Sequence, residues 1–319
     1  MPSPSRPRWT ALVPALAICL MPTASVDAAS PLQTNDVVAF IGGASTVAAD
    51  QSGLLETVLT LAHPGYRLRF RSVAWEGDTV FAQPRELNFP PTPQVLRRIQ
   101  ASVAFTQFGA LESLDPTTRP EAFAEAYGRV LDEIQAVTPR VILVIPPPYE
   151  PQSPPLPDYS AANALLDRLA IAIRALGAER RLSVIDLHQA FLRRPPASRW
   201  TYDGREWNPI GHRAVVSAWA SEFGLPSFAD QVESQSLWKQ PETRELLAAV
   251  SHKNRLWFDF WRPMNWAFLA GDRTEQQASR DHRDRNIRWF PAELEQFNPL
   301  IADAEIRIQS LASQIRFTP

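Results

Sequence analysis

Four polar residues of this chain have side chains that could carry out nucleophilic or acid–base chemistry: Ser45, Asp203, Glu206 and His212. A serine hydroxyl becomes a nucleophile when a base removes its proton, and the usual base is an imidazole oriented by a carboxylate. Glu206 follows Asp203 by three positions, and glutamate, with a reference pKa of about 4.3, is a poor base for a hydroxyl near neutral pH. These residues are therefore candidates for serine-based chemistry, with two carboxylates three positions apart in the sequence.

The elements that would position these residues alternate between strand and helix over residues 36–223. Short apolar runs predict strands, and segments with apolar residues at helical spacing predict helices. The alternation predicts an α/β fold with a parallel sheet covered on both faces. We expect strands at 37–41, 68–73, 103–108, 141–145 and 182–186, and helices at 54–61, 121–137, 161–176 and 209–223, the last capped by Asn208.

In sheets of this kind the working site lies beyond the carboxyl ends of the strands. The segments expected to form it are 42–46, 74–79, 109–113, 146–150 and 202–208.

The chain changes character after Leu225. We expect one long helix over 240–262, a charged loop over 273–288 and a last helix over 299–315. This part is interpreted as a helical appendage packed on the sheet domain. The appendage contains four tryptophans, Trp257, Trp261, Trp266 and Trp289. They either pack against the sheet domain or form an interface with a partner protein, since aromatic and arginine side chains are enriched at interfaces.

The first 29 residues have the pattern of an export signal. Arg6 and Arg8 precede an apolar run over 9–21, and small residues at 26–29 suit signal peptidase. The run is shorter than the ~20 residues of a comfortable membrane span. We therefore expect a cleaved, exported protein with no stable membrane insertion, with a retained anchor as the alternative.

Cys19, the only cysteine, lies inside this signal, so the mature chain has no thiol for a disulfide, a metal site or a nucleophile. The formal net charge of −2 becomes about −3 without residues 1–29, which gives no electrostatic footprint for nucleic acid. No glycine-rich nucleotide loop and no His-x-x-x-His pair occurs. We expect no cofactor and no metal ion, and the oligomeric state stays open.

Roughly residues 36–223 resemble the SGNH or GDSL hydrolases, a flavodoxin-like class of serine esterases and acetylesterases. In that family the nucleophile follows the first strand in a Gly-Asp-Ser turn, and a later Asp-x-x-His pair supplies the orienting carboxylate and the base. A glycine after the second strand and an asparagine after the third supply oxyanion donors. The resemblance implies a three-layer sandwich with a five-stranded parallel sheet over 30–225, followed by a mainly helical extension over 226–319.

Three of the four signature positions hold residues of non-catalytic type, namely Ala44, Leu111 and Glu206. Segment 40–45 places Gly43 at the Asp position and Ala44 at the nucleophile position, which leaves Ser45 one place late. One place rotates a side chain by about 100° on a helix, so Ser45 is either a shifted nucleophile or a capping or packed hydroxyl. Leu111 replaces the asparagine, and an apolar side chain donates no hydrogen bond to an oxyanion.

Some of the other family positions match the family pattern and some do not. Gly77 matches the oxyanion glycine, although any tight turn could also need a glycine there. Asp203 matches the orienting carboxylate, and Glu206 stands where the base should be. His212 is a common downstream position in the family and is interpreted as a helix-surface or core histidine, with a catalytic role as the less favoured alternative.

The resemblance implies ester hydrolysis, and the substitutions predict a catalytically impaired protein kept as a carbohydrate- or partner-binding module. The alternative is an active esterase in which Ser45 attacks a small acyl ester or acetylated sugar. A weaker alternative is a metal site or a glycosidase-like carboxylate pair formed by the loop residues Asp78, Glu112, Asp203 and Glu206. Acidic residues are common in loops, so their presence alone does not indicate such a site.

Overall fold

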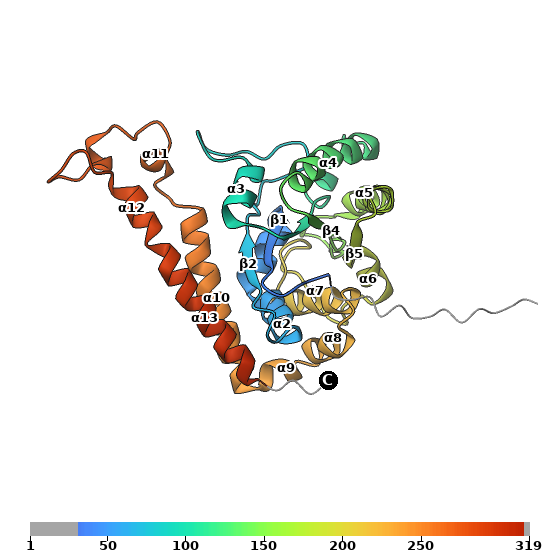
Figure 1. The fold of residues 1–319 in the computed structure, drawn as a ribbon. Helices are drawn as coiled ribbons and strands as arrows, with labels where there is room; N and C mark the ends of the chain where they lie inside the picture. Colours follow the sequence, from blue (N-terminus) through green and yellow to red (C-terminus); the bar gives the residue numbers. More distant parts are fainter. Residues whose placement is uncertain (1–30, 316–319) are drawn as a thin grey trace, which may run out of the picture.

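The computed structural model describes residues 31–315, and within them five parallel strands form one sheet in the order β2-β1-β3-β4-β5 (Figure 1). This order is that of the flavodoxin-like doubly wound folds, so the predicted α/β sheet is confirmed. The strands are β1 (Val37–Gly42), β2 (Arg69–Ser72), β3 (Val103–Gln107), β4 (Arg140–Ile145) and β5 (Ser183–Asp186).

Helices cover both faces of the sheet and enclose two apolar cores. Successive strand residues point to opposite faces, so Val38 and Phe40 enter one core while Ala39 and Ile41 enter the other. The first core is covered by α1 (Ala44–Ser52), α2 (Leu54–Ala62), α6 (Leu187–Arg193), α7 (Pro209–Glu222) and α8 (Pro226–Glu233). The second core is covered by α3 (Thr92–Ile99), α4 (Pro120–Gln135) and α5 (Ser160–Arg180).

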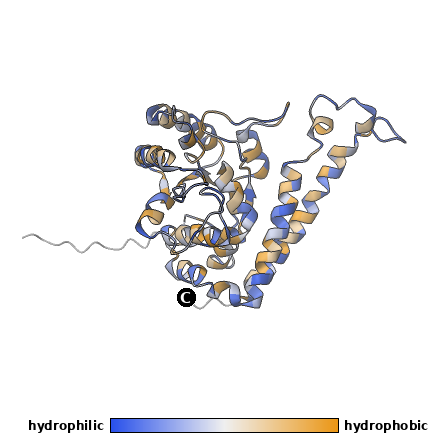
Figure 2. Ribbon diagram, turned by 180° about the vertical axis from the view of Figure 1, so that it is seen from behind, coloured by the Kyte–Doolittle hydropathy of each residue, from blue (hydrophilic) through white to orange (hydrophobic). Residues whose placement is uncertain are grey.

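The C-terminal extension is helical, as expected. It begins with α8, which packs on the first core, and continues with α9 (Ser236–Lys239), α10 (Pro241–Trp261), α11 (Trp266–Leu269), α12 (Trp289–Glu295) and α13 (Phe297–Gln314). The long helices α10 and α13 lie side by side next to β2 (Figure 1) and show polar and apolar residues intermixed along their length (Figure 2). Leu246 and Val250 of α10 join the first core, and Trp257 and Phe260 join the second. The extension therefore spans the β2 edge of the sheet and contributes to both cores.

Helix α1 was not expected from the sequence. Its residues form no continuous apolar stripe, and only Thr46 and Val47 are buried. Within the described part of the chain no helix combines the length and apolar character that a membrane span needs. The expected signal peptide lies outside the described residues.

Candidate active site

The turn from β1 into α1 is sterically tight. Gly42 has a φ of +157°, and a Cβ atom there would lie 2.4 Å from the carbonyl oxygen of Gln107. Gly43 is the N-cap of α1, and its Cβ would lie 3.0 Å from the carbonyl oxygen of Asp78. An aspartate at position 43, as in the family's Gly-Asp-Ser turn, would therefore have to displace the neighbouring loop.

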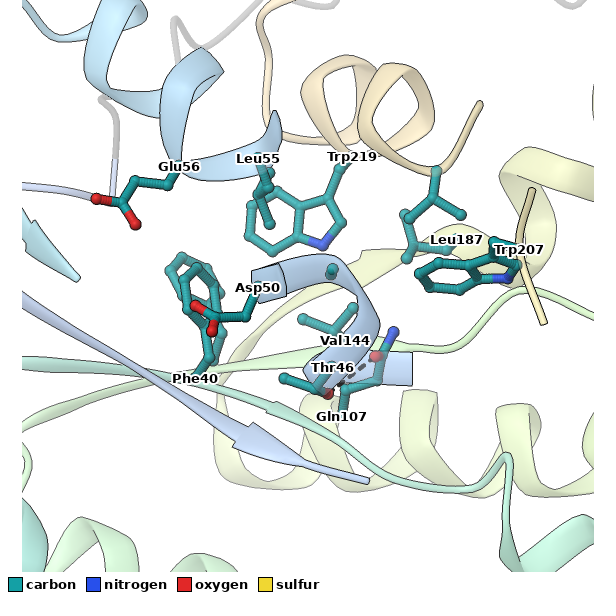
Figure 3. A pocket seen from close by; sticks show the side chains of 13 residues that line it. Phe40, Thr46, Asp50, Leu55, Glu56, Gln107, Val144, Leu187, Trp207 and Trp219 are labelled. Carbon is teal, nitrogen blue, oxygen red and sulfur yellow. Dashed lines mark hydrogen bonds between the residues drawn. The ribbon is translucent and has the colours of Figure 1, made fainter. Parts of the chain in front are cut away.

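The first turn of α1 divides its side chains between the core and a cleft. Thr46 is buried, and its hydroxyl donates to Gln107 Oε1 at 3.1 Å (Figure 3). Ala44 and Ser45 are half-buried and line a cleft of about 880 Å³. Since α1 has no side-chain cap, Ser45 does not act as a capping serine, and its hydroxyl makes no hydrogen bond to any residue in the described range. Ser45 therefore has no base bound to it.

All five sequence segments expected at the carboxyl edge contribute to this cleft. They bring together the positions that family resemblance singled out, except Gly43 and Gly77. Three further contributors, Gln235, Trp238 and Leu247, come from the helical extension and were not expected. The lining from the expected segments includes Ala44, Ser45, Glu76, Leu111, Tyr149, Asp203, Arg205, Glu206 and Trp207.

Gly77 lies beside the cleft, where its neighbour Glu76 forms part of the lining. A Cβ at Gly77 would meet no atom within 4 Å, and its φ lies outside the left-handed region. The turn therefore does not need a glycine at this position on steric grounds, which leaves the match to the oxyanion glycine without a structural explanation.

The loop after β3 turns one carboxylate inward and one leucine outward. Glu112 accepts hydrogen bonds from the backbone N–H groups of Gly109 and Val80, both at 2.8 Å. Burial raises the pKa of Glu112, and the backbone hydrogen bonds oppose this effect. Leu111 lines the cleft and brings no side-chain donor to it.

Asp78 is likewise engaged in holding its own loop. Both of its carboxylate oxygens accept from Arg85, at 2.6 and 2.7 Å, and burial raises the pKa of Asp78 against the effect of that guanidinium. Asp203 and Glu206 line the large cleft, whereas Asp78 and Glu112 do not. The four loop carboxylates therefore do not line one cleft, since Asp78 and Glu112 face a separate small pocket, and over residues 31–315 no cluster of three metal-ligating side chains is found.

The side chain of Asp203 stabilises the turn that follows it by accepting hydrogen bonds from the backbone. Its Oδ1 accepts from the N–H groups of Arg205 at 2.8 Å and Glu206 at 2.7 Å. Burial acts to raise the pKa of Asp203, but these hydrogen bonds and the charge of Arg205 outweigh it, so that pKa is lowered. Glu206 is exposed in the cleft, and its carboxylate makes no hydrogen bond or ion pair to another described residue.

The start of α7 is fixed as the sequence predicted. The side chain of Asn208 accepts from Ile210 N at 2.8 Å and Gly211 N at 3.1 Å, so Asn208 is the N-cap. A Cβ at Gly211 would lie 2.1 Å from the carbonyl oxygen of Trp200. A glycine is therefore required there for the helix to approach the preceding loop.

His212 also lines the cleft, although the sequence favoured a surface or core position. Its ring stands edge-on to Trp207, with the centroids 5.6 Å apart. Burial lowers the pKa of His212, and the charge of Glu206 acts in the opposite direction. The imidazole is therefore largely neutral near pH 7, and no hydrogen bond joins it to Ser45 among the described residues.

A second, small cavity of about 30 Å³ lies beneath α1 (Figure 3). It has room for about two water molecules. Its walls are largely aromatic and aliphatic, and Trp207 lines both this cavity and the cleft. Burial raises the pKa of Asp50, which faces the cavity, to about 7; the charge of Lys253 lowers that pKa and the charge of Glu56 raises it.

A cleft at the carboxyl edge of a 2-1-3-4-5 parallel sheet, with the helix after β1 opening onto it, defines a flavodoxin-like α/β protein with a candidate ligand site in the usual place. Residues 39–214 match the model of the GDSL-like lipase/acylhydrolase family. The match covers more than half of the chain, so the chain belongs to this family, whose general reaction is ester hydrolysis.

Solved structures share the fold at low sequence identity. A gut microbial diltiazem-metabolizing enzyme matches with 10% identity and a TM-score of 0.58, over 90% of this chain and 97% of its own. At that coverage the likeness includes part of the C-terminal helices.

Two further structures match a smaller share of the chain. An alpha/beta hydrolase from the metagenome of Lake Arreo, Spain, has 16% identity and a TM-score of 0.49 over 61% and 98% of the two chains. A catalytic mutant of an acetylxylan esterase from Geobacillus stearothermophilus has 14% identity and a TM-score of 0.45 over 60% and 96%. No curated protein matches the chain.

Proposed function

We propose that this protein is an exported member of the GDSL family that has lost acyl-transfer chemistry and uses its cleft to bind a carbohydrate or a carbohydrate ester. One observation carries the proposal: Ala44, Leu111 and Glu206 line the same cleft, where the family's nucleophile, oxyanion donor and base would meet. Each of the three side chains is of a type that cannot perform the corresponding step.

The chemical argument concerns the combination of the three substitutions. A missing oxyanion donor alone costs about 10²–10³ in rate. A missing nucleophile or base leaves only the contributions of the oxyanion hole and of binding. With Leu111 in place of a donor, the first of those contributions is weakened as well, so little rate enhancement is expected.

The cleft itself is suited to a ligand. Its volume of about 880 Å³ lies in the range of small-molecule sites. Tyr149 and Trp238 supply aromatic surface, and Arg205, Glu206 and Gln51 supply polar groups. Aromatic faces beside polar side chains suit a sugar ring, which has both apolar faces and hydroxyl groups.

The test compares the native protein with its Ser45→Ala variant on para-nitrophenyl acetate, together with calorimetric titration of an acetylated xylo-oligosaccharide. We expect equal, background rates of hydrolysis in both proteins and measurable binding of the sugar. The proposal predicts that Glu206→Gln weakens this binding without changing hydrolysis. Hydrolysis by the native protein well above that of Ser45→Ala would contradict the loss of catalysis.

A second candidate function is an active esterase that uses Ser45 as a shifted nucleophile. The observation that favours it is that Ser45 and His212 line the same cleft, and the imidazole is largely neutral near pH 7. A fluorophosphonate probe distinguishes the two functions, because labelling of Ser45 that disappears in His212→Ala would support the esterase.

The export part of the proposal depends on the signal-like pattern of residues 1–29. Mass spectrometry of the N-terminus of protein produced in a secreting host is expected to find cleavage after Ala28 or Ala29. A mature protein that keeps Arg6 and Arg8 would contradict export through a cleaved signal.

A further inference from the structure

Strand β2 forms one edge of the sheet, with its inner side bound to β1. The backbone N–H groups of Arg69, Val73 and Trp75 donate to carbonyl oxygens of β1 or its flanking residues at 2.9–3.0 Å. Backbone groups alternate in direction along a strand, so the even-numbered residues Leu68, Phe70, Ser72 and Ala74 present their carbonyls to the opposite, free side. Unpaired edges of this kind are normally covered or blocked in folded proteins.

The C-terminal extension supplies a side-chain donor to every second carbonyl along this free edge. The donors on α10, or just after its end, are Lys253, Trp257 and Arg262, and Gln309 is on α13. The four hydrogen bonds are Gln309 Nε2 to Leu68 O at 3.2 Å, Lys253 Nζ to Phe70 O at 3.2 Å, Trp257 Nε1 to Ser72 O at 2.6 Å and an Arg262 guanidinium nitrogen to Ala74 O at 2.5 Å. We call this set the edge ladder.

The edge ladder ends at the wall of the cleft. Besides Ala74, Arg262 pairs with Glu76, with 2.6 Å between the guanidinium nitrogen and Oε2. Its guanidinium also lies over the rings of Trp75, at 4.4 Å, and Phe258, at 5.0 Å. The Arg262 side chain is only 11% exposed, whereas the Glu76 side chain is 50% exposed, so the pair lies at the border between the protein and the solvent. Because Glu76 lines the cleft, the extension directly holds one of its walls.

The contacts of Arg262 use properties that only arginine has. A planar guanidinium can donate to a carbonyl and a carboxylate at the same time while it stacks on an aromatic ring. A lysine at this position could still donate to both acceptors, as Lys253 does to Glu56 and Phe70, but it would lose the stacking and the fixed planar geometry. Arg262 therefore constrains the conformation of the turn at residues 74–77 through several directional contacts, and its role is more than that of a nearby positive charge.

We propose that the C-terminal extension is a positioning element of the cleft, in which the edge ladder fixes β2 and Arg262 fixes the turn at residues 74–77. The inference concerns the same cleft as the proposed function and rests on that cleft being the binding site. It holds whether the ligand is bound only or also hydrolysed.

The test is hydrogen–deuterium exchange on the full-length protein without ligand, followed by mass spectrometry of peptides from residues 73–79. We expect Arg262→Gln to speed exchange there at least tenfold, and to leave exchange in β4 unchanged. The matched control is Arg307→Gln in the same extension, which removes an exposed pair with Glu245 at 3.1 Å and should change neither region.

A conservative variant separates positioning from general stability. Arg262→Lys is expected to give an exchange rate between those of the native protein and Arg262→Gln, with all three proteins folded by circular dichroism. Unchanged exchange over 73–79 in Arg262→Gln, or an equal increase in β4, would overturn the proposal. If Arg262→Gln does not fold, Arg262→Lys decides by the same comparison.

A binding measurement then connects the turn to the ligand. Titration of an acetylated xylo-oligosaccharide is expected to give at least tenfold weaker binding to Arg262→Gln than to Arg307→Gln. Absence of binding to the native protein would contradict the proposed function alone, because the exchange experiment needs no ligand. Equal affinity of the two variants for the sugar would contradict the positioning role.

Discussion

Lys253 of α10 and Glu56 of α2 form an ion pair with 2.8 Å between Nζ and Oε2, and their side chains are only 1% and 5% exposed. The pair connects the extension to the sheet domain across the first core. Burial raises the pKa of Glu56, and the charge and hydrogen bond of Lys253 oppose that effect. Since desolvation of a buried pair offsets much of its attraction, removing one partner is worse than removing both.

The first prediction uses this asymmetry. Lys253→Met leaves the carboxylate of Glu56 buried without its partner, and is expected to lower the free energy of unfolding by about 3–5 kcal/mol. The double variant Lys253→Met with Glu56→Leu should recover a large part of that loss. Urea denaturation near pH 7 measures both, and a double variant as unstable as the sum of the two single variants would contradict the interpretation.

The second prediction contrasts two glycines. Gly77→Ala introduces a Cβ with no atom within 4 Å, so the midpoint of thermal unfolding should stay within about 2 °C of the native value. Gly211→Ala places a Cβ 2.1 Å from the carbonyl oxygen of Trp200 and should lower the free energy of unfolding by more than about 1–3 kcal/mol. Comparable melting curves for the two variants would show that the α7 contact relaxes without cost.

The sequence predicted the centre of the sheet well because β1 and β4 are nearly continuous apolar runs with both faces buried. Residues of β4 such as Val141 and Ile145 belong to such a run, and Asn208 marks the start of α7 unambiguously. Helix α1 escaped prediction because tertiary contacts at Thr46 and Val47, and not a periodic pattern, hold it. Patterns within one segment reveal elements whose burial is regular, and α1 is not of that kind.

For the site, the sequence located the cleft, since the carboxyl ends of parallel strands meet at one edge. It could not show that Trp238 and Leu247 of the extension complete the lining. The edge ladder could not be predicted from the sequence either, because Lys253 and Phe70 are 183 residues apart and no local sequence pattern marks either of them as a partner in this hydrogen bond. Long-range side-chain contacts with single backbone carbonyls leave no periodicity in a sequence.

The third prediction restores the residue types of the family. The triple variant Ala44→Ser, Leu111→Asn and Glu206→His should hydrolyse para-nitrophenyl acetate at least about 10²-fold faster than the native protein. Each single variant should gain little, because a nucleophile, its base and the oxyanion donor act as a unit.

The triple variant leaves position 43 as glycine, since a Cβ at Gly43 would lie 3.0 Å from the carbonyl oxygen of Asp78. Its matched control is the same variant with Ala44 restored, which lacks only the nucleophile and should lose the gained activity. A native rate equal to that of the triple variant would contradict the idea that these three positions limit catalysis.

The fourth prediction concerns the pH dependence that Asp50 gives to stability. Burial raises its pKa from 3.8 to about 7 in the folded protein, with Lys253 and Arg262 of the α10 segment lowering it and Glu56 of α2 raising it. A raised carboxyl pKa means that folding favours the protonated form. Its contribution to stability is therefore fully present below pH ~4, declines as the pH rises towards 7, and is lost above that pH.

Asp50→Asn mimics the protonated form at every pH. Relative to native protein, its free energy of unfolding should rise between pH ~4 and pH ~7, by roughly 4 kcal/mol at most, and stay constant at higher pH. Asp203→Asn is the matched control: the lowered pKa of Asp203 confines the loss of its contribution to acid below about pH 4, so its free energy of unfolding relative to native protein should stay nearly constant from pH 4 to 8. Chemical denaturation from pH 4 to 8 measures all three proteins, and parallel curves for the native protein and Asp50→Asn would show that Asp50 does not titrate in this range. Divergence in the expected direction would show that ionised Asp50 destabilises the folded protein at neutral pH, on the same helix that carries Ser45 into the cleft.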